Sequence, residues 1–160
     1  MRADIINPFL VSIVNVLATM AQTEAKVGKP VIKRDNVGQG DVSGVIGLAG
    51  EQTKGSIAIT FTEKAIIDIA SRMLGEELDK VDETVADMVG EITNMVTGGA
   101  KKILSEKGYK FNLATPSIIV GKGHMISHKS KAPVILLPFE TSAGSFFVEI
   151  CFDDFAVKKQ

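Results

Sequence analysis

The chain has 160 residues, which is enough for one well-packed domain and too few for two of ordinary size. Hydrophobic residues make up 45% of it and charged residues 23%, as in folded globular proteins and unlike disordered ones. The formal net charge is −1, and no cluster of Lys or Arg is interleaved with aromatic residues, so we expect no nucleic-acid partner. We therefore expect a single domain over residues 1–160.

Two local features bear on the cellular compartment. The single cysteine, Cys151, cannot form an internal disulfide, and its apolar surroundings predict a buried thiol in a reducing compartment. The apolar stretch from Phe9 to Ala21 imitates the core of a signal peptide, but only Arg2 precedes it as a positive charge, and Ser12 and Asn15 interrupt it. No run reaches the roughly 20 apolar residues of a membrane span. We expect a cytoplasmic protein without a membrane partner.

The first predicted element is an amphipathic helix from Pro8 to Lys26, with Asn7 as its N-cap. Helical spacing places one group of residues on a broad apolar side and a second group on a polar stripe. The apolar group is Phe9, Leu10, Ile13, Val14, Val16, Leu17 and Met20, and the polar group is Ser12, Asn15, Thr19 and Thr23.

A hairpin and a short helix are predicted next. The strand-like runs Val42 to Ala49 and Ser56 to Phe61 flank a polar loop with glycine at both ends, which is typical of a β-hairpin. A helix from Glu63 to Leu74 follows, opened by Thr62 and closed by Gly75.

The longest predicted element is a helix from Glu83 to about Lys107, with Asp82 as its N-cap and Gly108 at its end. Four strands are predicted after it, and a loop over residues 121–131 separates the second of these strands from the third. The four strands are Tyr109 to Leu113, Ser117 to Val120, Val134 to Phe139 and Ser145 to Phe152.

The two halves of the chain resemble each other. Val45-Ile46 and Gly55-Ser56 in the first half are separated by the same interval as Val134-Ile135 and Gly144-Ser145 in the second. Each of these hairpins follows a long helix that carries an asparagine on its polar stripe. The pattern predicts a weak internal duplication of a helix–hairpin unit. The expected fold is α/β (α+β), with long helices packed on one face of a largely antiparallel sheet.

The candidate site lies on the long helix. Asp87, Glu91, Asn94 and Gly98 recur at spacings of four, three and four, so they share one side of the helix, opposite its apolar side. Small residues surround them, namely Gly90, Thr93 and Thr97. Because each glycine inside a helix costs about 1 kcal/mol relative to alanine, close approach of another surface is one reason to keep them.

Asp87-x-x-x-Glu91-x-x-Asn94-x-x-x-Gly98 resembles the D-x-x-x-E-x-x-N-x-x-x-G signature of the CheC, CheX and FliY family of chemotaxis phosphatases. The likeness to CheX extends to the opening helix with Asn15, to the strand from Val42 to Leu48 and to the Met73-Leu74-Gly75-Glu76-Glu77 segment. The resemblance implies a CheC-like fold, a homodimer joined through the sheets, and hydrolysis of the phosphoaspartate of a CheY-like response regulator.

The resemblance also implies the role of each site residue. Asn94 would position the attacking water, and Glu91 would pair with a lysine of the regulator. Asp87, Gly90, Thr97 and Gly98 would contact the partner. The regulator would supply Mg²⁺, and the chain would need no cofactor or metal of its own. These residue types suit phosphoryl transfer, which depends on positioning more than on covalent help.

Other interpretations remain beside this one. On spacing alone, Asp87, Glu91 and Asn94 are a solvated helix face. A second interpretation is a non-catalytic module of the same fold that binds response regulators or a small ligand. A structural part in the flagellar switch is a lesser alternative. In the first helix the counterpart motif is Ser12-x-x-Asn15, which lacks the glutamate. We expect this copy to be inactive and Asn15 to lie at a helix–strand or subunit contact.

His124 and His128 have a spacing of four, but they lie in a predicted loop without acidic or cysteine neighbours in the sequence. A flexible surface loop is therefore expected there, and not a metal site.

Overall fold

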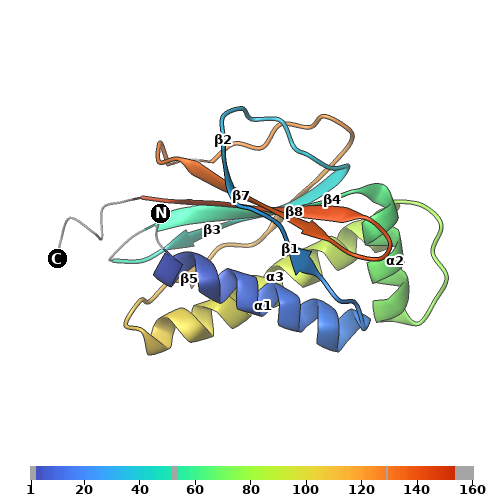
Figure 1. Ribbon diagram of the computed structural model, residues 1–160, viewed down its shortest axis with the longest axis horizontal. Helices are drawn as coiled ribbons and strands as arrows, with labels where there is room; N and C mark the ends of the chain where they lie inside the picture. The colour runs from blue at the N-terminus through green and yellow to red at the C-terminus, as the bar shows by residue number, and fades with distance from the viewer. Residues whose placement is uncertain (1–2, 52–53, 129, 154–160) are drawn as a thin grey trace.

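The computed structural model describes residues 3–51, 54–128 and 130–153. Within these ranges the chain forms three helices and eight strands (Figure 1). The helices are α1 (Ala3–Ala21), α2 (Glu63–Leu74) and α3 (Glu83–Glu106). The strands are β1 (Lys26–Val27), β2 (Val31–Lys33), β3 (Val42–Ala49), β4 (Lys54–Phe61), β5 (Asn112–Leu113), β6 (Ser117–Val120), β7 (Val134–Glu140) and β8 (Ser145–Phe152).

All the described strands join one sheet in the order β1-β7-β8-β4-β3-β5, with β2 also paired to β7 and β6 to β3. Every pairing between them is antiparallel. Figure 1 shows α1 and α3 on one side of the sheet, while the segments that lead into β3 and β7 lie over the other side. The prediction of helices on a largely antiparallel sheet is confirmed.

The topology has the predicted duplication. Each long helix, α1 or α3, is followed by two short strands and then by a hairpin, β3–β4 or β7–β8. The short strands of each unit pair with the hairpin of the other unit. The two hairpins meet at the centre of the sheet, where β4 pairs with β8 and Ile57 lies opposite Ile150. The two units therefore build one sheet together, and each completes the edge of the other.

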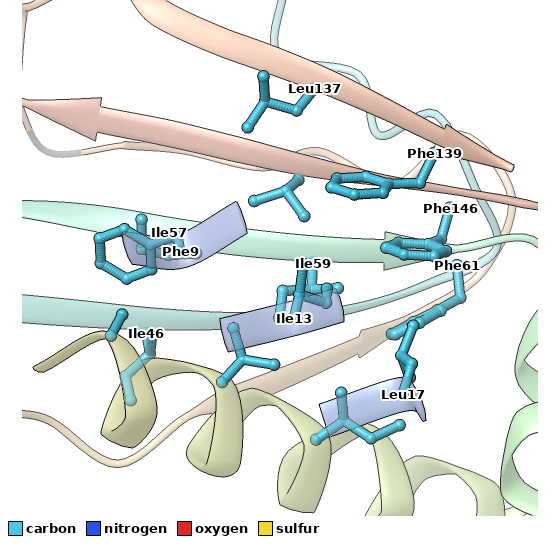
Figure 2. Packing of buried hydrophobic residues seen from close by; sticks show 14 of the residues in the cluster. Phe9, Ile13, Leu17, Ile46, Ile57, Ile59, Phe61, Leu137, Phe139 and Phe146 are labelled. Atoms are coloured by element: carbon cyan, nitrogen blue, oxygen red, sulfur yellow. The ribbon is translucent and has the colours of Figure 1, made fainter. Parts of the chain in front are cut away.

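The core lies between the helices and the sheet (Figure 2). Phe9, Ile13 and Leu17 project from successive turns of α1 and are at most 1% exposed. The rings of Phe139 and Phe146 stack on the sheet with centroids 4.7 Å apart. Because alternate residues of a strand share a face, the core-facing residues of β4 and β8 follow a period of two. They are Ile57, Ile59 and Phe61 in β4, and Phe146, Val148 and Ile150 in β8.

The first helix differs from its predicted bounds. It begins at Ala3 and ends at Ala21, so Pro8 lies inside it and is not its first residue. β1 and β2 were not predicted. They are two and three residues long, and their side chains are exposed or half-buried, so neither carries the alternating pattern by which strands are recognised.

One helix in the described part of the chain, α1, is long and apolar enough to meet the criterion for a membrane span, with a mean hydropathy of 1.6. Its apolar side includes fully buried residues of the core, Ile13 and Leu17 among them. A core helix of this kind passes the same test.

Candidate active site on helix α3

Helix α3 begins where the sequence predicts. The side chain of Asp82 accepts a hydrogen bond of 3.1 Å from the backbone N–H of Val85, which satisfies one free donor of the first turn. The helix ends at Glu106, and Gly108 follows with a φ of 94° that favours glycine. The helix buries one apolar stripe against α1 and the sheet, made of Val85, Val89, Ile92, Val96, Ala100 and Leu104. This burial fixes which side of α3 faces outward.

The predicted site residues lie along that outward side. Asp87, Glu91 and Asn94 are exposed, and Gly90 and Gly98 are half-buried. Because residues three and four apart are neighbours on a helix surface, Glu91 and Asn94 project about one turn apart. The structure thus brings a carboxylate and an amide together on an accessible ridge, which we call the α3 ridge (Asp87, Glu91, Asn94).

Thr97 does not lie on the accessible surface where the sequence places it. It is fully buried, and its hydroxyl donates to the backbone oxygens of Thr93, at 2.7 Å, and of Asn94, at 3.3 Å. Thr93 is fully buried as well, and its hydroxyl donates to the Val89 oxygen at 2.8 Å. A threonine that bonds the preceding turn in this way leaves its polar group satisfied inside the core. These threonines support the α3 ridge from beneath.

The two glycines beside the ridge are not required by packing within the chain. A Cβ at Gly98 would meet nothing within 4 Å, and a Cβ at Gly90 would only make ordinary contact with Ile118, at 3.6 Å. Both positions would therefore accept a larger residue without a clash in this chain. The approach of a partner surface gives a physical reason for leaving them bare.

The motif in the first helix is arranged differently. Ser12 is 4% exposed and points into the contact between α1 and α3, where its hydroxyl donates to the Val96 oxygen at 2.7 Å. Asn15 is exposed on α1, so it is not held at a helix–strand contact within the described chain. The serine and the asparagine therefore do not form a pair on one accessible ridge, in contrast to Glu91 and Asn94.

The two histidines lie in a surface loop, as the sequence predicts, but both are bound to the sheet. His128 Nδ1 lies 2.5 Å from the Ser56 hydroxyl, and its Nε2 lies 3.0 Å from Oε1 of Glu149. The other oxygen of Glu149 is 2.8 Å from Nζ of Lys33. All three ionisable side chains are at most 4% exposed. Lys33, His128 and Glu149 thus form a buried charge cluster on the face of the sheet opposite the helices.

His124 makes a second attachment of the same loop. Its Nε2 lies 2.6 Å from the hydroxyl of Ser43 on β3, and its Nδ1 lies 2.6 Å from the Gly121 oxygen. Ser43 in turn lies 2.6 Å from the hydroxyl of Thr60 on β4. In the described ranges, no three His, Cys, Asp or Glu side chains gather as a metal site would require. The histidines join the loop to the outer face of the sheet.

The sequence did not point to these contacts, because each histidine meets residues far away in the chain. Ser43 is 81 residues from His124, and Ser56 is 72 residues from His128. The one available signal was Glu149, a charged residue within the apolar run from Phe146 to Cys151, between the core-facing residues Val148 and Ile150. A buried carboxylate requires a partner, so its presence there predicts a cation nearby.

Comparisons with known proteins point to one family. Residues 42–140 match the family model described as "Chemotaxis phosphatase CheX". A CheC-like superfamily protein from Shewanella sp. PV-4 is 56% identical, with a TM-score of 0.90, and the match covers 96% of this chain and 99% of that one. Chemotaxis protein CheX from Vibrio vulnificus is 54% identical, with a TM-score of 0.88, over 94% of this chain and 100% of that one.

One similar structure contains a partner. The CheX of the CheX–CheY–BeF3–Mg²⁺ complex from Borrelia burgdorferi is 31% identical, with a TM-score of 0.79, over 94% of this chain and 99% of that one. FliY from Thermotoga maritima, at 19% identity and a TM-score of 0.66, shares the fold. No match was found among the curated proteins.

Proposed function

Because this chain belongs to the CheX family of chemotaxis phosphatases, we propose that it hydrolyses the phosphoaspartate of a CheY-like response regulator. The observation that carries the proposal is the α3 ridge, where Glu91 and Asn94 are both exposed one turn apart. The Borrelia burgdorferi CheX, solved in complex with CheY, supports the choice of partner.

Asn94 orients the attacking water. Its side-chain oxygen can accept a hydrogen bond from the water, and its side-chain nitrogen can donate a hydrogen bond to a phosphoryl oxygen. The water oxygen then adds to phosphorus as the bond to the aspartyl oxygen breaks, which releases inorganic phosphate and restores the regulator's carboxylate. The amide stays neutral and takes no proton, so its contribution is the alignment of the reactants.

Glu91 fixes the docking position. A carboxylate beside the phosphoryl group would repel it, but one turn away it is suitably placed to pair with a lysine of the regulator. Asp87 lies one turn further along the exposed side, and Gly90 and Gly98 leave room for the partner's surface. The Mg²⁺ of the reaction belongs to the regulator and would neutralise the phosphoryl charge there, so this chain contributes no metal ligand.

We further propose that the protein is a cytoplasmic homodimer joined through its sheets. β1 and β2 both pair with β7 at one end of the sheet. These two short strands form an edge of the sheet within the described part of the chain. Three apolar side chains on them are about half exposed, namely Val27 at 47%, Val31 at 46% and Ile32 at 50%. Such an edge is suited to pairing with a second copy.

The test is to mix the purified protein with phosphorylated candidate regulators and Mg²⁺ and to follow phosphate release. We expect acceleration by the native protein and its loss in Glu91→Ala and in Asn94→Ala, with folding retained. Unchanged regulator turnover in both variants would instead support a non-catalytic module that binds regulators or small ligands. No acceleration with any regulator would contradict the proposal.

A further inference from the structure

Ser12 joins helix α1 to helix α3 close to the proposed site. Its hydroxyl donates a hydrogen bond of 2.7 Å to the backbone oxygen of Val96, two residues after Asn94. The side chain is 4% exposed, although helical spacing assigns it to a polar stripe. A buried hydroxyl requires a partner, and here the partner is the backbone of the helix that carries the α3 ridge.

The two helices approach each other closely beside this hydrogen bond. A Cβ at Gly99 would overlap the Ser12 hydroxyl oxygen and would lie 3.4 Å from the Ser12 Cβ. Any larger residue at position 99 would therefore push α3 away from α1, or displace the serine. Glycine is unfavourable inside a helix, and this contact supplies the reason for its presence.

A second close contact holds the same segment of α3 from the sheet side. A Cβ at Gly44 on β3 would overlap the hydroxyl of Thr93 and would lie 3.2 Å from Cγ1 of Val89. Thr93 is adjacent to Asn94 in the sequence and is fully buried. The turn that carries Asn94 is thus held between Gly44 on the sheet and Ser12 on α1.

We propose that Ser12 is a positioning residue for the reaction, because its contact with Val96 and Gly99 sets where Asn94 stands relative to the rest of the protein. The inference rests on the proposed phosphatase function. A hydroxyl can donate to the Val96 oxygen, whereas a glutamate at position 12 would set a carboxylate against that carbonyl, acceptor against acceptor. The serine that interrupts the motif of the first helix therefore also supports the working motif of the third.

Three variants test this contact. In Gly99→Ala the new methyl group overlaps the Ser12 hydroxyl, and we expect kcat to fall about tenfold while KM stays within about twofold, since misalignment costs rate more than docking. In Ser12→Ala the hydrogen bond to the Val96 oxygen is lost but the close packing of α1 against α3 remains, and we expect kcat to fall about threefold. The double variant Ser12→Ala/Gly99→Ala removes the overlap, so its kcat should return to the level of Ser12→Ala.

A matched control is Gly47→Ala on β3, where the new Cβ meets nothing within 4 Å and kcat should not change. With kcat expressed per folded protein, its fall in Gly99→Ala and its recovery in the double variant report the position of Asn94, because a merely stabilising role would change only the folded fraction. An unchanged kcat in Gly99→Ala, or no recovery in the double variant, would overturn the proposal.

The side-chain amide signal of Asn94 in a ¹H–¹⁵N spectrum gives a second readout that does not depend on activity. It should shift in Gly99→Ala and return toward its native position in the double variant. If the native protein accelerates no dephosphorylation, the proposed function fails, while this signal still decides the positioning role. A signal that stays unmoved in Gly99→Ala would overturn it.

Discussion

Nζ of Lys33 lies 2.8 Å from Oε2 of Glu149, and the two side chains are only 4% and 1% exposed. Lys33 comes from the short edge strand β2, whereas Glu149 lies in the centre of the sheet on β8. The contact therefore joins a peripheral strand to the middle of the protein on the face that the helices leave open. Removing one charge would leave the other buried with less compensation.

We expect Lys33→Met to lower the free energy of unfolding by about 3–5 kcal/mol, as is typical when one partner of a buried ion pair is removed. The double variant Lys33→Met/Glu149→Gln should recover much of that loss, because the carboxylate that loses its lysine partner is then removed as well. Urea unfolding measures both. Lys26→Met is the control, since Lys26 and Glu24 form an exposed pair and its removal should leave stability unchanged. A loss for Lys33→Met no larger than for the control would contradict the role of the buried charge cluster.

The histidine contacts predict local behaviour of the loop over residues 121–133. His128→Ala removes the partner of the Ser56 hydroxyl and one partner of Glu149, so it should cost about 1–3 kcal/mol and loosen the loop. Hydrogen exchange of the loop amides should become faster, with little change in α3, which lies on the opposite side of the sheet (Figure 1). Lys122→Ala, an exposed change in the same loop, should leave the exchange as it was. Equal hydrogen-exchange protection of the loop amides in His128→Ala and Lys122→Ala would contradict the role of His128 in holding the loop on the sheet.

Cys151 gives a prediction about pH. The thiol is fully buried, and this burial raises the pKa of Cys151 above its ordinary value of 9.0. The native thiol should therefore react slowly with a thiol reagent near neutral pH and quickly in urea. Because the folded state holds the thiol proton more tightly than the unfolded state, the protonated Cys151 contributes to the free energy of unfolding. This contribution is fully present below pH 9 and is lost as the pH rises above it. Above pH 9 the free energy of unfolding of the native protein should fall more steeply with pH than that of Cys151→Ala. Equal slopes in the two proteins would refute this prediction.

The parts of the fold that the sequence predicts well are those in which one face is buried. The apolar stripe of α3 repeats over the whole helix, and Asp82 marks its start, so the exposed side with Glu91 and Asn94 could be deduced before any coordinates. The first hairpin was likewise predictable, because two strand-like runs, Val42 to Ala49 and Ser56 to Phe61, flank a polar loop with glycine at both ends. These signals are local, and burial on one side makes them strong.

The features that could not be predicted depend on contacts between distant segments. Ser12 has the residue type and the spacing of a surface stripe, and only the neighbouring backbone of α3, 84 residues away, makes its burial favourable. The strand β2 lacks any alternation, because it is an edge strand held in part by the ion pair of Lys33 with Glu149. The periodic spacing of apolar residues indicates which side of an element is buried against a broad core. It does not reveal a polar contact that depends on a single distant partner.

The contact between α3 and β3 predicts the effect of Gly44→Ala. The added methyl group would overlap the Thr93 hydroxyl, so we expect a loss of about 1–3 kcal/mol in unfolding free energy from overpacking. Thr93→Ala in the same chain removes the overlapping atom and should recover part of this loss. Gly47→Ala, on the same strand but facing open space, is the matched control. Thermal unfolding of the four proteins distinguishes overpacking from the general cost of changing a strand glycine. A loss equal to that of the control would contradict the close approach.

The different roles proposed for Glu91 and Asn94 predict different kinetic effects. Asn94→Ala should lower kcat about 100-fold or more with KM changed only slightly, because aligning the water contributes in the transition state and not to docking. Asn94→Asp should be no better, since a carboxylate there would face the charged phosphoryl group. Glu91→Ala should mainly raise KM for the phosphorylated regulator, because it removes a docking ion pair.

Salt provides the decisive comparison between these two residues. An exposed ion pair is screened, so KM of the native protein should rise with ionic strength, and Glu91→Gln should lose a large part of that dependence. Asn94→Ala should have a lower kcat but the same dependence of KM on salt as the native protein. The control Glu106→Gln, at the far end of α3, should keep both the native kcat and the native salt dependence. If Glu91→Gln kept the full salt dependence of KM, Glu91 would not be the docking carboxylate. If Asn94→Ala raised KM at unchanged kcat, Asn94 would serve binding and not the alignment of water.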